Sequence, residues 1–226
     1  MELPLHLQGR QAAGLVELEP VAQFEIGPAH NFIYLVLDWA GKRAAIVDPQ
    51  KDLTEPLGAL RRHGFVLTHV LLTHSHWDHT AGVPELIRTH PDVPIVCHPQ
   101  DHHRLHGIPL KPLGHGESVT VGNIRVELLH TPGHSAGGCC FHVHTPQPYL
   151  LTGDTLFIRD CGRTDLETGS TEQMFASLQR IKTLPPQLII LPGHHYAPEC
   201  ASVLEKELQE SGPLKVRNIA ELQALP

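Results

Sequence analysis

Residues 73–79 read Thr-His-Ser-His-Trp-Asp-His, so three histidines and a carboxylate stand together directly after a short apolar run. This pattern predicts a buried strand that opens into a loop of metal ligands, because neutral imidazole and carboxylate bind Zn, Fe and Mn. In an extended segment, residues i and i+2 face the same side. We therefore expect His74 and His76 to reach one metal, and Asp78 and His79, after the turn, to reach a second.

Three segments downstream repeat this order of an apolar run, a tight turn and a candidate ligand. The runs and ligands are 126–129 with His134, 149–151 with Asp154, and 188–191 with His194. Short apolar runs bounded by Gly and Pro are typical of buried strands. Ligands at the ends of neighbouring strands can assemble one site from distant parts of a chain. A histidine-rich surface loop is the alternative in a chain with 19 His, but the repeated pattern favours one metal centre.

The complete ligand set resembles that of the metallo-β-lactamase superfamily. The set is His74, His76, Asp78, His79, His134, Asp154 and His194. The order of these residues and the gaps between them are similar to those of the family. The resemblance covers about residues 31–207. The resemblance implies an α/β fold, an αββα sandwich of two mixed β-sheets flanked by helices, with the metals at one edge between the sheets. We expect a single domain of this fold over residues 1–226.

Apolar patterns predict the main elements of this sandwich. Strands are expected at residues 32–37 and 44–48. Helices are expected at residues 53–63, 80–89, 171–183 and 201–209. Ser170 or Thr171 is the expected N-cap of the third helix, because a hydroxyl there accepts a hydrogen bond from the first turn. The two halves of the sandwich are expected to meet near His115.

Two metals held side by side predict a hydroxide nucleophile, because coordination lowers the pKa of water from about 15.7 toward 7. Asp154 is the candidate bridge, since its two oxygens can be shared between ions. The expected ligands are His74, His76 and His134 for the first metal, and Asp78, His79 and His194 for the second. Asp78 and Asp154 are thus the predicted catalytic carboxylates. No Cys nucleophile is then needed, so we expect Cys139 and Cys140 to pack on a strand.

The segment after Asp154 reads Asp-Cys-Gly-Arg-Thr-Asp at residues 160–165. It is similar to the matching loop of glyoxalase II (hydroxyacylglutathione hydrolase), where a cationic residue holds glutathione. It is also similar to the Cys-Gly-Arg-Thr-Asp run of persulfide dioxygenase. Both resemblances imply a small-molecule substrate that is a glutathione-like thiol conjugate. Arg163 is expected to pair with a carboxylate of that thiol, or else with Asp165 or Asp160 to rigidify the loop.

Hydrolysis of a glutathione-type thioester is the function that the resemblance favours, with two divalent metals (Zn and/or Fe, Mn). Trp77 within the first motif is typical of glyoxalase II, and residues 192–196 resemble its Gly-His-x-Tyr segment. Tyr196 is expected to touch the glutathione portion or to pack its ring. Two departures from glyoxalase II are Thr164, where an aromatic residue is expected, and an end at Pro226 that is too early for a helical C-terminal domain.

Persulfide dioxygenase is the alternative, with a single Fe(II) held by His74, His134 and Asp154. Two histidines and one carboxylate form the facial triad of non-haem iron oxygenases. A β-lactamase is disfavoured because those enzymes commonly carry Cys at the position of Asp154. A non-catalytic metal-binding module is a third hypothesis, but a structural zinc site closes with four ligands, fewer than this set offers.

Composition narrows the remaining classes. The formal net charge is −7 and no basic cluster is present, which disfavours nucleic-acid binding. Residues 1–6 lack the features of a signal peptide, and no apolar stretch approaches the ~18 residues of a membrane span. Five Cys without a Cys-x-x-Cys motif predict reduced thiols and a cytoplasmic protein. The histidine-rich segment 98–106 is expected to be a solvated loop or helix start.

Overall fold

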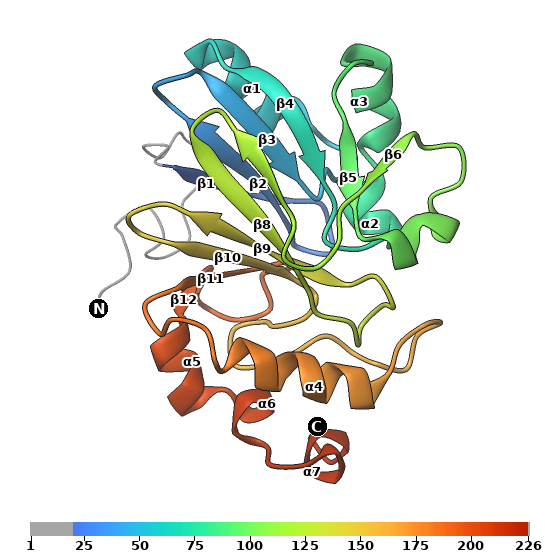
Figure 1. The fold of residues 1–226 in the computed structure, drawn as a ribbon, viewed down its shortest axis with the longest axis vertical. Coiled ribbons are helices and arrows are strands. Elements are labelled where there is room, and N and C mark those ends of the chain that lie inside the picture. Colours follow the sequence, from blue (N-terminus) through green and yellow to red (C-terminus); the bar gives the residue numbers. More distant parts are fainter. Residues whose placement is uncertain (1–19, 226) are drawn as a thin grey trace.

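The computed structural model describes residues 20–225, so the segment 1–6 considered for a signal peptide lies outside the described residues. Within the described part, two mixed sheets of six strands stack face to face, and helices cover both outer faces (Figure 1). This arrangement confirms the αββα sandwich. No helix in residues 20–225 has both the length and the apolar character needed to cross a membrane.

The first sheet follows the order of the sequence. Its strands are β1 (Val21–Ile26), β2 (Asn31–Asp38), β3 (Arg43–Val47), β4 (Val66–Leu71), β5 (Ile95–Cys97) and β6 (Leu110–Pro112). The helical elements in this half are α1 (Thr54–His63), α2 (Trp77–Thr80), α3 (Val83–Thr89) and the 3-10 helix η2 (Pro99–Arg104). His115 lies in the connection from β6 to the second sheet, which confirms the predicted meeting point of the two halves.

The second sheet has the order β12-β11-β10-β9-β8-β7. Its strands are β7 (Ser118–Val121), β8 (Ile124–His130), β9 (Cys139–His144), β10 (Tyr149–Gly153), β11 (Ile189–Pro192) and β12 (Ser202–Val203). Its helices are α4 (Thr171–Ile181), α5 (Leu204–Glu210), α6 (Gly212–Lys215) and α7 (Ile219–Gln223). In Figure 1 these helices lie on the side of the second sheet that faces away from the first.

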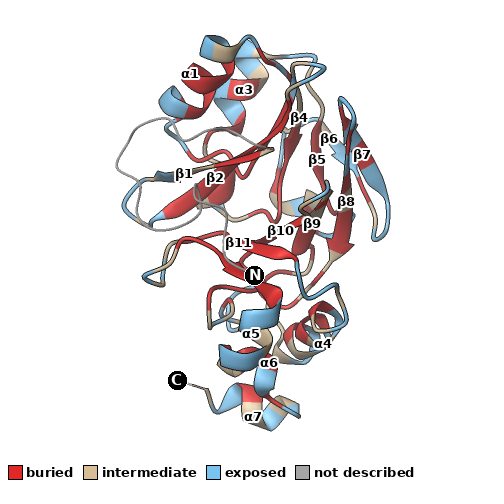
Figure 2. Cartoon of the chain, turned by 90° about the vertical axis from the view of Figure 1, so that its left-hand side faces the viewer, coloured by how far each residue is buried: buried red, intermediate tan, exposed pale blue. Residues whose placement is uncertain are grey.

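Strand β2 shows why the sequence folds into stacked layers. Every residue of β2 is buried, and alternate side chains of a strand point to opposite faces of the sheet. One face, with Phe32 and Val36, packs into the core between the sheets. The other, with Ile33 and Leu35, packs toward the outer helices. The run is continuously apolar because both faces are covered, as the buried strands in Figure 2 show.

Two predicted helices begin later than the sequence pattern suggests. In place of the predicted helix 80–89, α2 ends at Thr80 and α3 begins at Val83; between them, Gly82 donates its N–H to the carbonyl of Pro49 at 2.8 Å. A Cβ at Gly82 would lie 2.5 Å from the Gln50 carbonyl, so this backbone contact interrupts the helix. The predicted helix 201–209 begins only at Leu204, because Ser202–Val203 pair with β11 as a short strand.

The strand directions explain why distant segments share one edge. Strands β8 and β10 both run antiparallel to β9, and β10 runs parallel to β11. The C-terminal ends of β8, β10 and β11 therefore meet at the same edge of the second sheet. The residues that follow β4 in the first sheet reach this edge as well, since Cys139 at the start of β9 donates its N–H to the Thr73 carbonyl at 2.9 Å.

Candidate metal centre

The seven predicted metal ligands come together at this edge of the sandwich. Two groups have their ligand atoms within 4.8 Å of one another: His74 with His76 and His134, and Asp78 with His79 and His194. These are the two sets that the sequence assigns to two metals. Five of the seven side chains are buried and the other two, His76 and Asp78, are half-buried. The cluster is therefore screened from water but open on one side.

Facing lone pairs mark the second group as a cation site. His79 Nδ1 lies 3.0 Å from Asp48 Oδ2, and His194 Nδ1 lies 2.9 Å from the Ala29 carbonyl. Each Nδ1 must donate to its oxygen, so the neutral imidazoles present lone pairs at Nε2. These two Nε2 atoms lie only 3.1 Å apart. Two lone pairs at that distance require a cation between them, either a proton or a metal ion.

The first group has the same construction. His134 Nδ1 donates to the Arg163 carbonyl at 2.8 Å, which leaves its Nε2 as an acceptor 2.9 Å from His76 Nδ1. His74 Nε2 is buried and has no hydrogen-bond partner. A buried polar atom without a partner is costly, and a metal ion at this position removes that cost. A carbonyl that fixes the tautomer of a histidine is typical of the surroundings of metal ligands.

Asp154 lies between the two groups. Its Oδ2 is 3.4 Å from Nε2 of both His134 and His194, and its Oδ1 is 3.4 Å from His79 Nε2. Oδ1 is buried and has no hydrogen-bond partner. One carboxylate thus faces imidazoles of both groups, as a bridging ligand must. The donor set of imidazoles and carboxylates fits divalent Zn, Fe or Mn.

Electrostatics in the metal-free site agree with this geometry. Burial opposes a charge on His79, but Asp154, Asp48 and Asp78 outweigh it and raise the pKa of His79 to about 9. Burial likewise opposes the Asp154 carboxylate, but the surrounding histidines, first His79, hold its pKa well below the usual range. The metal-free site therefore holds a proton at neutral pH that a metal ion displaces on binding.

Three residues that support the ligands were not identified in the sequence. Asp48 receives the N–H of Thr73 at 2.8 Å and orients His79. Asp101 is fully buried and receives N–H groups of Ser75 and Gly137 at 2.8 and 2.7 Å, so it joins two ligand loops. Asn31 donates to Asp78 Oδ2 at 3.0 Å. Asp48 had one sequence signal, because it is the last residue of a predicted strand.

The two predicted substrate residues lie outside the buried cluster. Arg163 donates through Nε and Nη2 to Asp165 at 2.6 and 2.7 Å, and both side chains are exposed. The structure thus shows the pairing within the loop that was the alternative for Arg163. Tyr196 stacks on His194 with ring centroids 4.7 Å apart and an interplanar angle of 11°. Its side chain is 61% exposed, so it forms part of the rim of the cluster.

The two adjacent cysteines take no part in the site. Cys139 and Cys140 are buried free thiols on β9. Burial raises the pKa of Cys140 to about 11, so it is not a thiolate at neutral pH. This confirms the prediction that both residues pack on a strand. The other three cysteines are free as well.

The model of one protein family, described as the metallo-beta-lactamase superfamily, matches residues 26–194. The match runs from the last residue of β1 to the last predicted ligand, His194, and so includes all seven ligands. The chain belongs to the metallo-β-lactamase superfamily. Members of this superfamily bind divalent metals, which agrees with the two ligand groups described above.

Curated relatives within the metallo-β-lactamase superfamily carry a more specific name. The chain is 38% identical over 167 residues to the hydroxyacylglutathione hydrolase of Rhodospirillum rubrum, a match that covers 74% of this chain and 62% of the relative. It is 33% identical over 223 residues to the hydroxyacylglutathione hydrolase of Xylella fastidiosa, with coverage of 92% and 78%. The chain thus spans less than two thirds of the first of these relatives.

Solved structures of the superfamily share the fold. ETHE1 from Myxococcus xanthus superimposes with a TM-score of 0.77 at 26% identity, over 91% of this chain and 92% of ETHE1. The protein TTHA1623, solved in a di-iron-bound form, superimposes with a TM-score of 0.72 at 29% identity, over 84% of this chain and 98% of TTHA1623.

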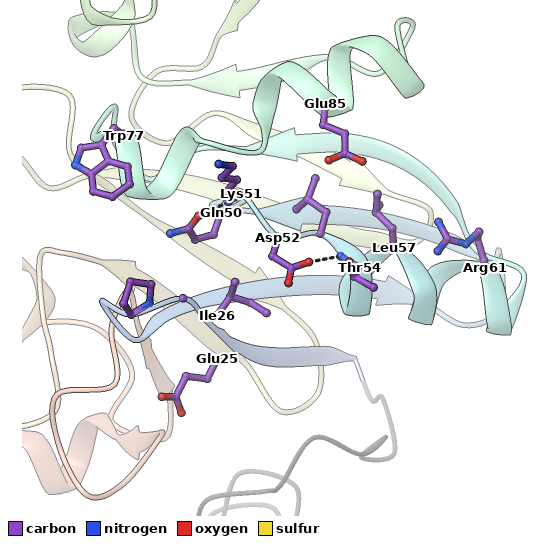
Figure 3. Close-up of a pocket in the computed structure, with 13 residues that line it drawn as sticks. Glu25, Ile26, Gln50, Lys51, Asp52, Thr54, Leu57, Arg61, Trp77 and Glu85 are labelled. Carbon is purple, nitrogen blue, oxygen red and sulfur yellow. Dashed lines mark hydrogen bonds between the residues drawn. The ribbon is translucent and has the colours of Figure 1, made fainter.

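A pocket of about 910 Å³ opens beside the metal centre of this metallo-β-lactamase domain (Figure 3). Its walls are the β1–β2 turn, residues 50–54 and α1, with Trp77 at one end and Arg61 at the other. None of the seven ligands lines the pocket. Trp77, which stands between two ligands in the sequence and is 72% exposed, is its link to the centre.

The histidine-rich segment 98–106 was predicted to be a solvated loop or a helix start, and the structure shows a helix start. His98 is the N-cap of η2, and its Nδ1 accepts the N–H of Gln100 at 3.4 Å. Its ring stacks on His130 with centroids 3.7 Å apart. Burial first, and then the charge of His130, lower the pKa of His98 to about 4. The folded protein therefore keeps His98 neutral.

This lowered pKa makes the domain sensitive to acid. Between the folded pKa of about 4 and the unfolded value of about 6.5, only the unfolded state binds the proton, so stability falls as the pH falls through this window. His98→Asn keeps the N-cap acceptor but cannot bind the proton. When the pH is lowered from 7 to 5, we expect its free energy of unfolding to fall by about 1 kcal/mol less than that of wild type. Urea unfolding at both pH values measures this; equal losses would contradict it.

Proposed function

We propose that this protein hydrolyses a glutathione-type thioester at a centre of two divalent metal ions. The observation that carries the proposal is the position of Asp154 between two complete ligand groups, each with facing imidazole nitrogens. The curated relatives named hydroxyacylglutathione hydrolase support the same substrate class. Because the chain covers only part of the first relative, the substrate is inferred from the site and from this similarity together.

The proposed metal ligands are those of the two groups, with Asp154 shared between them. When bound, divalent ions supply Lewis acidity for the thioester carbonyl and lower the pKa of water toward neutrality. The similarity to TTHA1623 in its di-iron-bound form supports iron as one occupant; the same donor set accepts zinc and manganese. Asp78 and Asp154 are the proposed catalytic carboxylates: Asp154 faces imidazoles of both groups, and Asp78 faces those of the second group.

Hydrogen bonds from neighbouring groups fix the orientation of the ligands. The Arg163 and Ala29 carbonyls accept the Nδ1 protons of His134 and His194, so that both Nε2 atoms point at the centre. Asn31 donates to Asp78 Oδ2 at 3.0 Å, the oxygen that lies 3.5 Å from His194 Nε2, and so orients this carboxylate toward the second group. Fixed ligands need no reorganisation when the substrate arrives, which is the general advantage of a preorganised site.

The rim of the cluster fits a thiol conjugate with an ionised peptide portion. Trp77 and Tyr196 expose 72% and 61% of their surface beside the ligands, and exposed aromatic side chains at a site entrance commonly contact ligands. Arg163 supplies a positive charge, which Asp165 neutralises in the free protein. A substrate carboxylate must therefore displace Asp165 to pair with Arg163.

Opposite changes in KM test this role of Arg163. We expect Arg163→Gln to raise the KM for S-lactoylglutathione by about tenfold, because a charge-assisted bidentate pair is lost. Asp165→Asn frees the guanidinium, so we expect it to lower KM by about threefold. Both variants keep kcat, since neither residue contacts the metal ligands through its side chain. An unchanged KM in both variants would show that Arg163 acts within the loop alone.

A second candidate is oxygen-dependent oxidation of a thiol-bound persulfide at a single Fe(II) held by His74, His134 and Asp154. The Cys-Gly-Arg-Thr-Asp run and the structural similarity to ETHE1 fit this candidate. The second ligand group argues against this candidate, because a single Fe(II) leaves that group without a metal. With one metal only, the Nε2 atoms of His79 and His194, 3.1 Å apart, keep a proton in place of a metal.

A further inference from the structure

Three candidate metal ligands lie on the second sheet, away from the metal centre. They are Glu127 on β8 and His142 and His144 on β9, and their ligand atoms lie within 4.8 Å of one another. Among the groups of this kind in residues 20–225, this is the one that shares no residue with the metal centre or with Asp48 beside it.

Strand geometry brings these side chains to one face. His142 and His144 are two residues apart on β9 and so point to the same side of the sheet. Glu127 lies directly opposite His142 in the antiparallel pair, where facing side chains are close enough to interact. Cys140 and Leu129, on the same face, pack with the outer helices. The three candidate ligands continue this face beyond the buried part and are half-buried.

The contacts already hold the ligand atoms together. His144 Nε2 lies 2.9 Å from Glu127 Oε2, and the rings of His142 and His144 are 3.9 Å apart between centroids. Arg125 places Nη2 3.0 Å from the same Glu127 oxygen. An ion pair between neighbours on the same face of β8 explains Arg125 and Glu127. It does not explain two adjacent imidazoles on the same face, both beside one carboxylate.

We propose that Glu127, His142 and His144 form a further metal site, which binds a divalent transition ion such as Zn²⁺ and links β8 to β9. Two imidazoles and one carboxylate are a common ligand set for zinc, and a fourth position stays open to water. Arg125 competes with the ion for Glu127. Its side chain is half-exposed, so it can turn into solvent when the ion binds, at a cost in affinity.

Zinc binding to the metal-loaded protein tests this site. The protein is first saturated at the metal centre, and further Zn²⁺ binding is followed by equilibrium dialysis. We expect one additional ion in wild type, with a Kd on the order of micromolar. His144→Gln removes one of the two imidazole ligands that β9 supplies, so we expect the additional ion to be lost. Arg125→Gln removes a competing charge and tightens binding by about fivefold. The matched control His103→Gln changes an exposed histidine elsewhere and leaves the additional ion in place.

Three results would overturn the proposal. One is a wild-type protein that binds no zinc beyond the metal centre. Another is a His144→Gln protein that binds the additional ion as wild type does, because the zinc then lies on other histidines. The third is an Arg125→Gln protein with unchanged or weaker affinity, because Glu127 is then not a ligand. These dialysis results are independent of whether the protein hydrolyses thioesters.

Discussion

Replacing Asp154 by Asn is expected to empty both ligand groups and to reduce thioester hydrolysis by about 10³-fold or more, because metal ions contribute several kcal/mol to such reactions. The side chain is buried and faces imidazoles of both groups at 3.4 Å. Asn keeps the volume but removes the charge and one bridging oxygen. His79 also loses the strongest of the charges that raise its pKa.

The experiment measures bound metal after dialysis, turnover and thermal unfolding in the same preparation. Asp160→Asn is the matched control, because it changes an exposed carboxylate in the same loop and Asn can still accept the N–H of Cys161. We expect the control to keep its metal and its activity. An Asp154→Asn protein that retains two metals per chain contradicts the bridging role of this residue.

Gly162→Ala is the second change with a large expected effect. A Cβ at Gly162 would lie 1.9 Å from the Asp154 carbonyl oxygen and 3.1 Å from His134 Nδ1. Both neighbours belong to the centre, and the first is backbone, so the loop must shift. The next residue, Arg163, then moves the carbonyl that holds the His134 proton at 2.8 Å. A displacement of about 1 Å near a catalytic site can cost about 10²-fold in rate.

We therefore expect Gly162→Ala to lower kcat by about 10²-fold and to weaken metal binding, while the protein still folds with a loss of about 1–3 kcal/mol in stability. Gly212→Ala is the matched control. Its nearest contacts would be Leu225 side-chain atoms at 3.7 Å or more, so both activity and metal content should stay at wild-type values. Full activity in Gly162→Ala would mean that the loop can move without disturbing His134.

The metal ligands were predictable because each follows an apolar strand, and strand ends meet at a sheet edge. The fold followed from the same signals together with the family resemblance. Asp101 and Asn31 were not predictable, because a single polar residue gives no pattern; their roles depend on loops that only the packed sandwich brings together. The division at Gly82 was missed because it results from a backbone contact with Pro49 rather than from local propensity.

Side-chain pairing on the surface was harder to predict than ligand placement. The sequence offered Arg163 two partners, a substrate carboxylate or a neighbouring aspartate, and the free protein shows the pair with Asp165. A local pair between residues two apart forms without any tertiary constraint, so its presence does not decide what happens when a substrate arrives. The substrate roles of Arg163 and Tyr196 remain predictions, as do the single domain over residues 1–226 and the cytoplasmic location.

One measurement tests the central claim most directly. Purified protein is loaded anaerobically with Fe(II) or with Zn(II), and each preparation is divided between hydrolysis of S-lactoylglutathione and oxygen uptake with glutathione persulfide. A two-metal thioester hydrolase hydrolyses the thioester with either metal, takes up no oxygen, and loses turnover in both Asp78→Ala and His194→Ala. Enzyme-dependent oxygen uptake by the Fe(II) protein, abolished in His134→Ala and unaccompanied by thioester hydrolysis, would contradict the account.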